Sequence, residues 1–105
     1  MTNKDFTKII EDELEYVKSL LISKGEEYAV DTDRLSAFKK GAELMRTTPE
    51  VTLLGYLTKH IVSIYDMAMS DSLYTKEKWT EKITDFINYG LLLLALANEK
   101  GFKNE

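Results

Sequence analysis

The residues best suited to chemistry in this chain are acidic side chains near its C-terminal end. Glu81 and Asp85 are four residues apart, so on a helix they share one face, and Asn88 lies one turn further along. Magnesium commonly takes one or two protein carboxylates and fills its remaining positions with water and phosphate oxygens. This face predicts a Mg²⁺ site for a di- or triphosphate, with metal-activated water as the nucleophile. The alternative is an ordinary solvated helix face.

A second polar group, Lys59, His60, Ser63 and Asp66, follows helical spacing in the middle of the chain. Lys59, Ser63 and Asp66 share one stripe, and His60 flanks it. In the functional interpretation, Lys59 neutralises a phosphate, and Asp66 either helps to hold a cation or orients a neighbouring side chain. In the alternative, Lys59 and Asp66 form a surface pair worth roughly a few tenths of a kcal/mol, and His60 is a boundary residue.

Residues 25–34 have no clean period and contain side chains suited to turns, which predicts a loop. Lys24, Tyr28 and Arg34 place two cations and an aromatic ring in or beside it. In a nucleotide site, Tyr28 would stack on a base and Arg34 would bind phosphate through two hydrogen bonds. The alternative is that Tyr28 packs beneath the loop and Arg34 pairs with a neighbouring aspartate.

The composition limits the class of protein. A length of 105 residues predicts a single domain spanning residues 1–105. The absence of cysteine excludes thiolate metal ligands, and the net charge of -4 provides no broad basic field, so duplex nucleic acid is not an expected partner. Positions 1–20 do not resemble a secretory signal, and the longest apolar run, Leu91 to Ala97, is too short to span a bilayer. We expect a cytoplasmic protein without a membrane segment.

Apolar residues recur at helical spacing in four segments, and no segment has the pattern of a strand. The predicted fold is therefore all-α, a compact bundle of four main helices. The predicted core stripes are Phe6, Ile10, Leu14, Val17 and Leu21; Leu35, Phe38 and Ala42 with Leu44 or Met45; Leu54, Leu57, Ile61, Ile64 and Ala68; and Trp79, Ile83, Phe86, Gly90, Leu93 and Ala97.

The helix boundaries are predicted from capping residues. Pro49 after Thr47-Thr48 is the clearest helix start, and Gly25 and Gly101 are expected to end the first and last helices. Gly41 inside the second helix costs ~1 kcal/mol relative to alanine, so that helix must depend on tertiary packing. The predicted N-caps are Thr2 or Asn3, Asp33, Thr48 or Thr47, and Thr75.

The leucine-rich end of the last helix is apolar on every side. Leu92 and Leu96 continue the same face that carries Asp85 and Asn88. Either a second chain covers this end, or the carboxylates line a cleft with a leucine floor. Because a monomer of this size buries only roughly 60–68% of its unfolded surface, we expect a homo-oligomer, a dimer, through the Leu91–Leu96 region.

Four segments in order resemble a family of small phage and bacterial proteins called nucleotide modification associated domain 1. They are KGEEYA at 24–29, DRLSAFKK at 33–40, KHIVSIYDM at 59–67 and EKITDFINYGLLL at 81–93. The resemblance covers residues 20 to 99 and implies a link to phage nucleotide metabolism, without assigning a reaction. The motif positions that it marks are Lys24, Tyr28, Asp33, Arg34, Phe38, Lys59, His60, Ser63, Asp85, Asn88 and Tyr89. Among these positions, the predicted nucleotide-binding residues are Lys24, Tyr28, Arg34, Lys59, His60, Asn88 and Tyr89.

The chain is also similar, more weakly, to the all-α nucleoside triphosphate pyrophosphatases of the MazG and dimeric dUTPase group. That similarity implies an oligomeric, Mg²⁺-dependent enzyme with a Glu-x-x-Asp motif. Glu81 and Asp85 are one residue too far apart for this motif, and Glu13 in the first helix is expected to be a boundary residue that reaches water. The predicted function is nucleotide binding with Mg²⁺-dependent triphosphate pyrophosphohydrolysis, and its metal ligands are Asp66, Glu81 and Asp85. The alternative is a non-catalytic helical accessory or protein-interaction module.

Overall fold

The fold consists of four helices. The structure is a computed structural model, and it describes residues 1–27 and 33–104, apart from the side chains of residues 24–27. The helices are α1 (Asn3–Glu27), α2 (Ser36–Met45), α3 (Pro49–Met69) and α4 (Lys76–Lys100). No strand occurs in these described ranges. The predicted all-α bundle of four main helices is confirmed.

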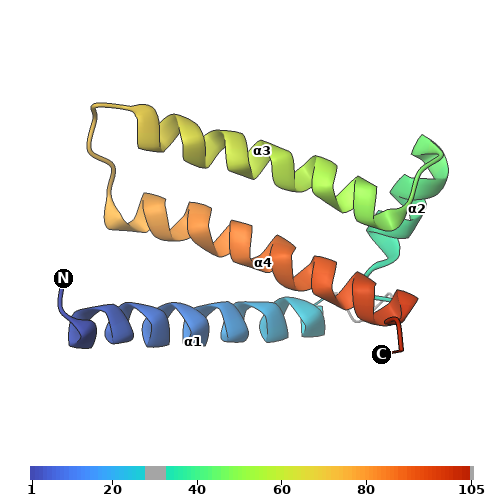
Figure 1. The fold of residues 1–105 in the computed structure, drawn as a ribbon, viewed down its shortest axis with the longest axis horizontal. Helices are drawn as coiled ribbons and strands as arrows, with labels where there is room; N and C mark the ends of the chain where they lie inside the picture. Colours follow the sequence, from blue (N-terminus) through green and yellow to red (C-terminus); the bar gives the residue numbers. More distant parts are fainter. Residues whose placement is uncertain (28–32, 105) are drawn as a thin grey trace.

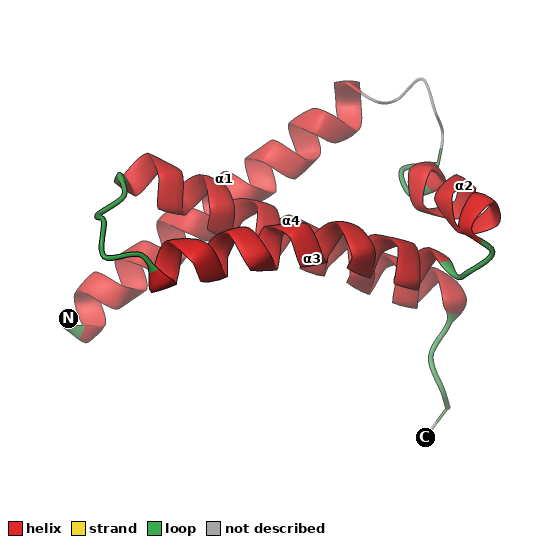
Figure 2. Ribbon diagram, turned by 90° about the horizontal axis from the view of Figure 1, so that it is seen from above, coloured by secondary structure: helices red, strands yellow, loops and turns green. Residues whose placement is uncertain are grey.

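Helix α4 is the central element of the bundle. It lies between α3, which runs antiparallel to it, and α1, which lies on its other side, while α2 packs against α3 (Figure 1). Figure 2 shows that α1 crosses α4 obliquely, so its two ends leave α4 on opposite sides. In the described part of the chain, no helix has the length and hydropathy needed to cross a membrane.

Three of the predicted N-caps are confirmed. The hydroxyl oxygens of Thr2, Thr48 and Thr75 accept hydrogen bonds from the backbone N–H groups three residues later, at 3.1, 3.3 and 3.1 Å. Pro49 occupies the first turn of α3, and Gly101 follows α4 with a φ of 98°, a conformation that favours glycine. The prediction for Gly25 is wrong, because α1 continues to Glu27.

The boundaries of α2 differ from the prediction. Leu35, not Asp33, is its N-cap residue, and the Asp33 carboxylate instead accepts a hydrogen bond from the Leu35 N–H at 2.9 Å in the preceding turn. The helix ends at Arg46, which adopts a left-handed conformation with a φ of 55°. Its N–H bonds back to carbonyls of the last turn, so this arginine takes the position in which glycine is usual.

The hydrophobic core lies where α2, α3 and α4 meet. We call this cluster of Leu35, Phe38, Leu53 and Leu96 the apolar end of the bundle. Leu53 is fully buried with 0% exposure, and Tyr89, Leu92 and Leu93 pack against the cluster. The leucine segment of α4 is therefore largely covered by its own chain. Leu91 and Leu94 keep exposed side chains, and dimerisation through this segment stays a prediction.

The predicted core stripes are rotated in the two long central helices. In α3 the buried residues are Leu53 and Met67, whereas the predicted Leu54 is 44% exposed. In α4 the side chains of Thr84 and Asn88 are buried, although the pattern placed Asn88 on the solvent face. Helix α1 contacts this side of α4 at Thr84, which hydrogen-bonds Glu13, so burial follows the positions of the neighbouring helices and not the apolar periodicity. Other predicted core residues that are exposed are Phe6, Ile10, Leu14, Leu44, Met45, Ile61, Ala68, Phe86 and Gly90.

Candidate functional site

The polar residues of α4 face two different helices. Thr84 lies toward α1, where its hydroxyl donates a hydrogen bond to the Glu13 carboxylate at 2.5 Å. Asp85 lies toward α3, with one carboxylate oxygen 3.7 Å from Nδ1 of His60. The polar side chains of α4 therefore do not form one shared face: Thr84 contacts α1, and the next residue, Asp85, contacts α3. Because α4 lies between α1 and α3, adjacent side chains on it meet different partners.

Asn88 lies one turn after Thr84 on the same side of α4. The residue is only 8% exposed, and its carbonyl oxygen Oδ1 has no hydrogen-bond partner among the described residues. A buried acceptor without a partner costs about 1–3 kcal/mol, so each such atom in a native protein requires an explanation. This carbonyl oxygen is therefore a candidate contact for a bound molecule that carries a hydrogen-bond donor.

His60 and Tyr89 form an aromatic pair between α3 and α4. Their ring centroids are 4.9 Å apart and the ring planes are tilted by 38°. Burial raises the pKa of the Tyr89 phenol above its usual 10.0, and the nearby charges of Asp85 and Tyr56 raise it further. Both Asp85 and His60 keep part of their side-chain surface exposed. The cluster is a polar contact that packs α3 against α4.

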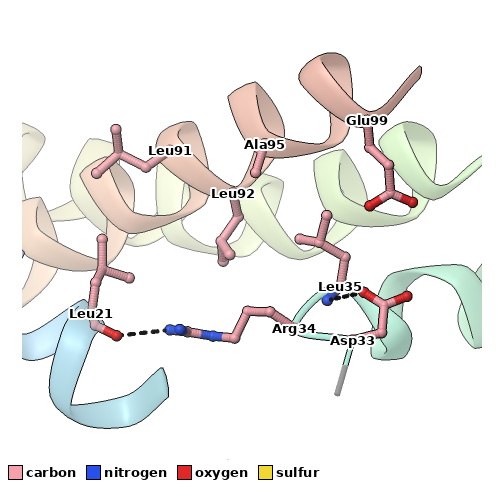
Figure 3. A pocket seen from close by; sticks show the side chains of 8 residues that line it. All are labelled: Leu21, Asp33, Arg34, Leu35, Leu91, Leu92, Ala95 and Glu99. Atoms are coloured by element: carbon pink, nitrogen blue, oxygen red, sulfur yellow. Dashed lines mark hydrogen bonds between the residues drawn. The ribbon is translucent and has the colours of Figure 1, made fainter. Parts of the chain in front are cut away.

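A hollow of about 360 Å³ lies on the same side of α4 as Asn88, one turn further toward the C-terminal end. Figure 3 shows its mixed lining: leucine and alanine side chains from α4 on one side, and Arg34 with Asp33 on the other. The residues that line it are Leu21, Asp33, Arg34, Leu35, Leu91, Leu92, Ala95 and Glu99. The hollow has leucine side chains in its floor, but the carboxylates that line it are Asp33 and Glu99 and not the predicted Glu81 and Asp85.

Charged side chains hold the rim of this hollow together. The Lys39 ammonium bonds the Asp33 carboxylate at 2.6 Å and also the Glu99 carboxylate, which joins α2 to the end of α4. The Lys39 contact, with the Leu35 N–H, lowers the pKa of Asp33 below its usual range. Arg34 donates a hydrogen bond to the carbonyl of Leu21 in α1 at 3.2 Å (Figure 3).

The predicted metal ligands occupy separate places. Asp66 and Glu81 are exposed on α3 and α4, while Asp85 lies beside His60. Among the described residues, no three histidine, aspartate or glutamate side chains gather closely enough to hold a metal ion. In a single chain, therefore, Asp66, Glu81 and Asp85 do not fit a shared Mg²⁺ site.

The predicted nucleotide-binding residues are only partly brought together. Arg34 lines the hollow, and Asn88 lies one turn from the hollow's floor. His60 and Tyr89 contact each other on the α3 side of α4, while Lys59 is exposed. Tyr28 and the side chain of Lys24 lie outside the described residues.

No family model matches this chain, and no curated protein or solved structure matches it significantly. The resemblance to nucleotide modification associated domain 1 therefore rests on its four sequence motifs. The structure adds to these motifs the buried Asn88 carbonyl oxygen and the hollow beside Arg34.

Sequence reasoning missed three residues that shape the site. Thr84 lies among the apolar residues of the last helix and has no feature that marks it. Lys39 and Glu99 are 60 positions apart in the sequence, so no local pattern links this pair. Glu13 is half-buried and paired with Thr84, so it does not simply extend into water. The sequence signal for the partial burial of Glu13 was its position between the two edges of the apolar stripe of α1.

Proposed function

We propose that this protein binds a nucleotide along the face of α4 that runs from Asn88 to the hollow beside Arg34. We call this face the α4 groove. The observation that carries the proposal is the buried Asn88 carbonyl oxygen, for which the described part of the chain offers no hydrogen-bond partner. Amino and hydroxyl groups of a base or sugar are donors that would satisfy it. Ligand pockets commonly occupy about 300–1,000 Å³, and the hollow of about 360 Å³ is at the small end of this range.

The chemistry of the hollow supports the same class of ligand. Leu91, Leu92 and Ala95 offer an apolar surface suited to a base or sugar ring. Arg34 is the cation in the lining, and its exposed guanidinium carries five N–H donors arranged to match phosphate oxygens. Its bond to the Leu21 carbonyl engages one of its terminal nitrogens and orients the side chain across the hollow.

Hydrolysis of the ligand is a separate question from its binding. The proposed Mg²⁺-dependent pyrophosphohydrolysis needs ligands that a single chain does not gather among its described residues. The proposal therefore assigns binding to the α4 groove and assigns no catalytic step. A pyrophosphate assay on the same samples measures whether any bound nucleoside triphosphate is also cleaved.

Thermal melting and calorimetry with a panel of canonical and modified nucleoside triphosphates test the proposal. A ligand at 100 times its Kd adds about 2.7 kcal/mol to the free energy of unfolding, which raises Tm by several degrees. Arg34→Gln should weaken binding about 10-fold or more. The matched control is Arg46→Gln, which removes the other arginine, an exposed one at the end of α2, and should leave Kd within about twofold.

Asn88→Leu provides the sharper test. It removes the buried acceptor without a partner, so the free protein should gain about 1 kcal/mol or more, while nucleotide binding should be lost. If Asn88→Leu binds nucleotides as tightly as the native chain, or if no nucleotide shifts Tm, the proposal is wrong.

A second candidate function, a non-catalytic accessory or protein-interaction module, is favoured by one observation. Apolar side chains on the first half of α1 are exposed, which is typical of a surface that binds protein. A failure of every nucleotide to bind, together with stable protein association, would favour this function.

A further inference from the structure

The first half of α1 carries an apolar face that no part of the described chain covers. Phe6 and Leu14 are 55% and 56% exposed, and Ile9 and Ile10 are also exposed. Phe6, Ile10 and Val17 follow helical spacing on one stripe, yet Val17 is only 2% exposed. One continuous stripe is thus buried in its second half and open in its first. Figure 2 shows the reason: the N-terminal half of α1 diverges from α4, so α4 does not cover it.

The whole chain exposes more surface than a compact monomer of the same mass. The chain exposes 8472 Å², whereas a folded monomer of 12.1 kDa is expected to expose about 6,000 Å². The radius of gyration of 16.3 Å likewise exceeds the ~13 Å expected for a compact chain of this length. The excess area of about 2,400 Å² is spread over the whole chain, of which the apolar face of α1 is one part, and it is comparable to the roughly 1,000–2,500 Å² that one protomer buries in an obligate dimer.

We propose that the face formed by Phe6, Ile9, Ile10 and Leu14 is the interface between two copies of this chain. We call it the α1 face. A second copy presents the same apolar residues, so a two-fold axis near Ile10 makes the surface self-complementary. Such an axis places Phe6 of one protomer near Leu14 of its partner across an antiparallel pair of α1 helices. Lys8 and Asp12 pair with each other at 2.7 Å on the exposed part of α1 and can remain in solvent.

This interface differs from the one expected at Leu91–Leu96. The leucine segment of α4 is largely covered by its own chain, whereas the α1 face has no cover in the described structure. The proposal also does not depend on nucleotide binding, because the α1 face lies outside the α4 groove.

Light scattering and sedimentation of the full chain test the interface. The native protein should have the mass of two chains, and Ile10→Glu should weaken association about 100-fold or more, because it places an unpaired charge in an apolar contact. The matched control is Ile22→Glu, which changes an isoleucine of similar exposure on another side of α1 and should leave the dimer intact. A monomeric native chain, or a dimer that Leu94→Glu breaks and Ile10→Glu does not, overturns the proposal.

A cross-linking experiment decides the matter if Ile10→Glu fails to fold. The chain has no cysteine, so a single introduced thiol reports only its own surroundings. Under mild oxidation, Ile10→Cys should form a disulfide-linked dimer at least about tenfold faster than Ile22→Cys, since only the first position lies at the two-fold axis. Equal rates for the two variants overturn the proposal.

Discussion

The two contacts that hold α4 in place differ in chemistry. The apolar end, where α4 meets α2 and α3, is a buried cluster of aliphatic and aromatic side chains around Leu53. The crossing of α1 over α4 instead combines one buried valine, Val17, with a hydrogen bond between Glu13 and Thr84. We call this second contact the α1 crossing. Most of the hydrophobic stabilisation within one chain is therefore at the apolar end.

The difference bears on the proposed interface between two α1 helices. Free energy from burial scales with apolar area at about 25 cal/mol per Å², and the α1 crossing covers little apolar area. A second chain on the α1 face would supply the missing burial. The apolar end, by contrast, is complete within one chain, and variants of the two contacts should behave differently.

The largest effect is expected at the apolar end. Leu53→Ala should lower the free energy of unfolding by about 2–5 kcal/mol, because it opens a cavity at a side chain with no exposed surface. The adjacent Leu54→Ala is the matched control and should cost below about 1 kcal/mol, because Leu54 is already half exposed. Urea unfolding monitored by circular dichroism measures both values, and equal losses would contradict the assignment of the core.

A smaller effect is expected at the α1 crossing. Thr84→Val keeps the shape of the side chain but removes the donor to Glu13, which should cost about 1–2 kcal/mol. Thr80→Val, one turn earlier on α4, is the control and should be close to neutral. In a Glu13→Ala background, Thr84→Val should lose most of its effect, since the two residues interact directly. Full additivity of the two changes would show that the hydrogen bond contributes nothing.

The packing of α2 on α3 permits a test of close approach. A Cβ added at Gly41 would lie 2.9 Å from Cγ2 of Thr52, and the Thr52 hydroxyl bonds the Thr48 carbonyl and fixes that side chain. Gly41→Ala should therefore destabilise the native protein by about 1 kcal/mol despite alanine's better helix propensity. In Thr52→Ser, which lacks Cγ2, the same change should become neutral or stabilising. A stabilising Gly41→Ala in the native background would exclude this contact.

The smallest effect concerns Tyr89, which packs against the apolar end. Because burial raises its pKa in the folded protein, the folded state holds the phenolic proton more tightly than the unfolded state. The free energy of unfolding should then fall as the pH rises above about 10, and Tyr89→Phe should reduce this fall. Tyr65→Phe, at an exposed tyrosine of α3, is the control for the alkaline unfolding curve. An identical alkaline slope in native protein and Tyr89→Phe would show that Tyr89 does not contribute.

Capping chemistry was the most predictable part of the structure. A capping threonine bonds an N–H three residues later, and a first-turn proline fixes its own backbone, so both act on their sequence neighbours. The sequence therefore predicts Thr48, Pro49 and Thr75 as helix-start residues, and the structure confirms them. The sequence showed that Gly41 lowers the helix propensity of α2. The structural reason for a glycine there is the close approach of Thr52, which lies on another helix.

The candidate site was less predictable. Arg34 and Asn88 were identified from their residue types and motifs; Arg34 lines the hollow, and Asn88 is buried one turn of α4 away from it. The predicted metal ligands Asp66, Glu81 and Asp85 do not lie together. Helical periodicity predicts which residues share a face, but it does not predict which neighbouring helix covers that face. Consecutive residues Thr84 and Asp85 consequently contact α1 and α3.

The sequence by itself determined the fold class, the four helices and most of their N-terminal caps, because these depend on interactions within about four residues. The tertiary structure decided which faces are buried. It placed polar Thr84 and Asn88 inside and left apolar Phe6 and Leu14 outside, because the oblique crossing of α1 over α4 sets where two surfaces meet. That crossing depends on contacts between residues more than 60 positions apart, such as Glu13 and Thr84, which no local pattern encodes.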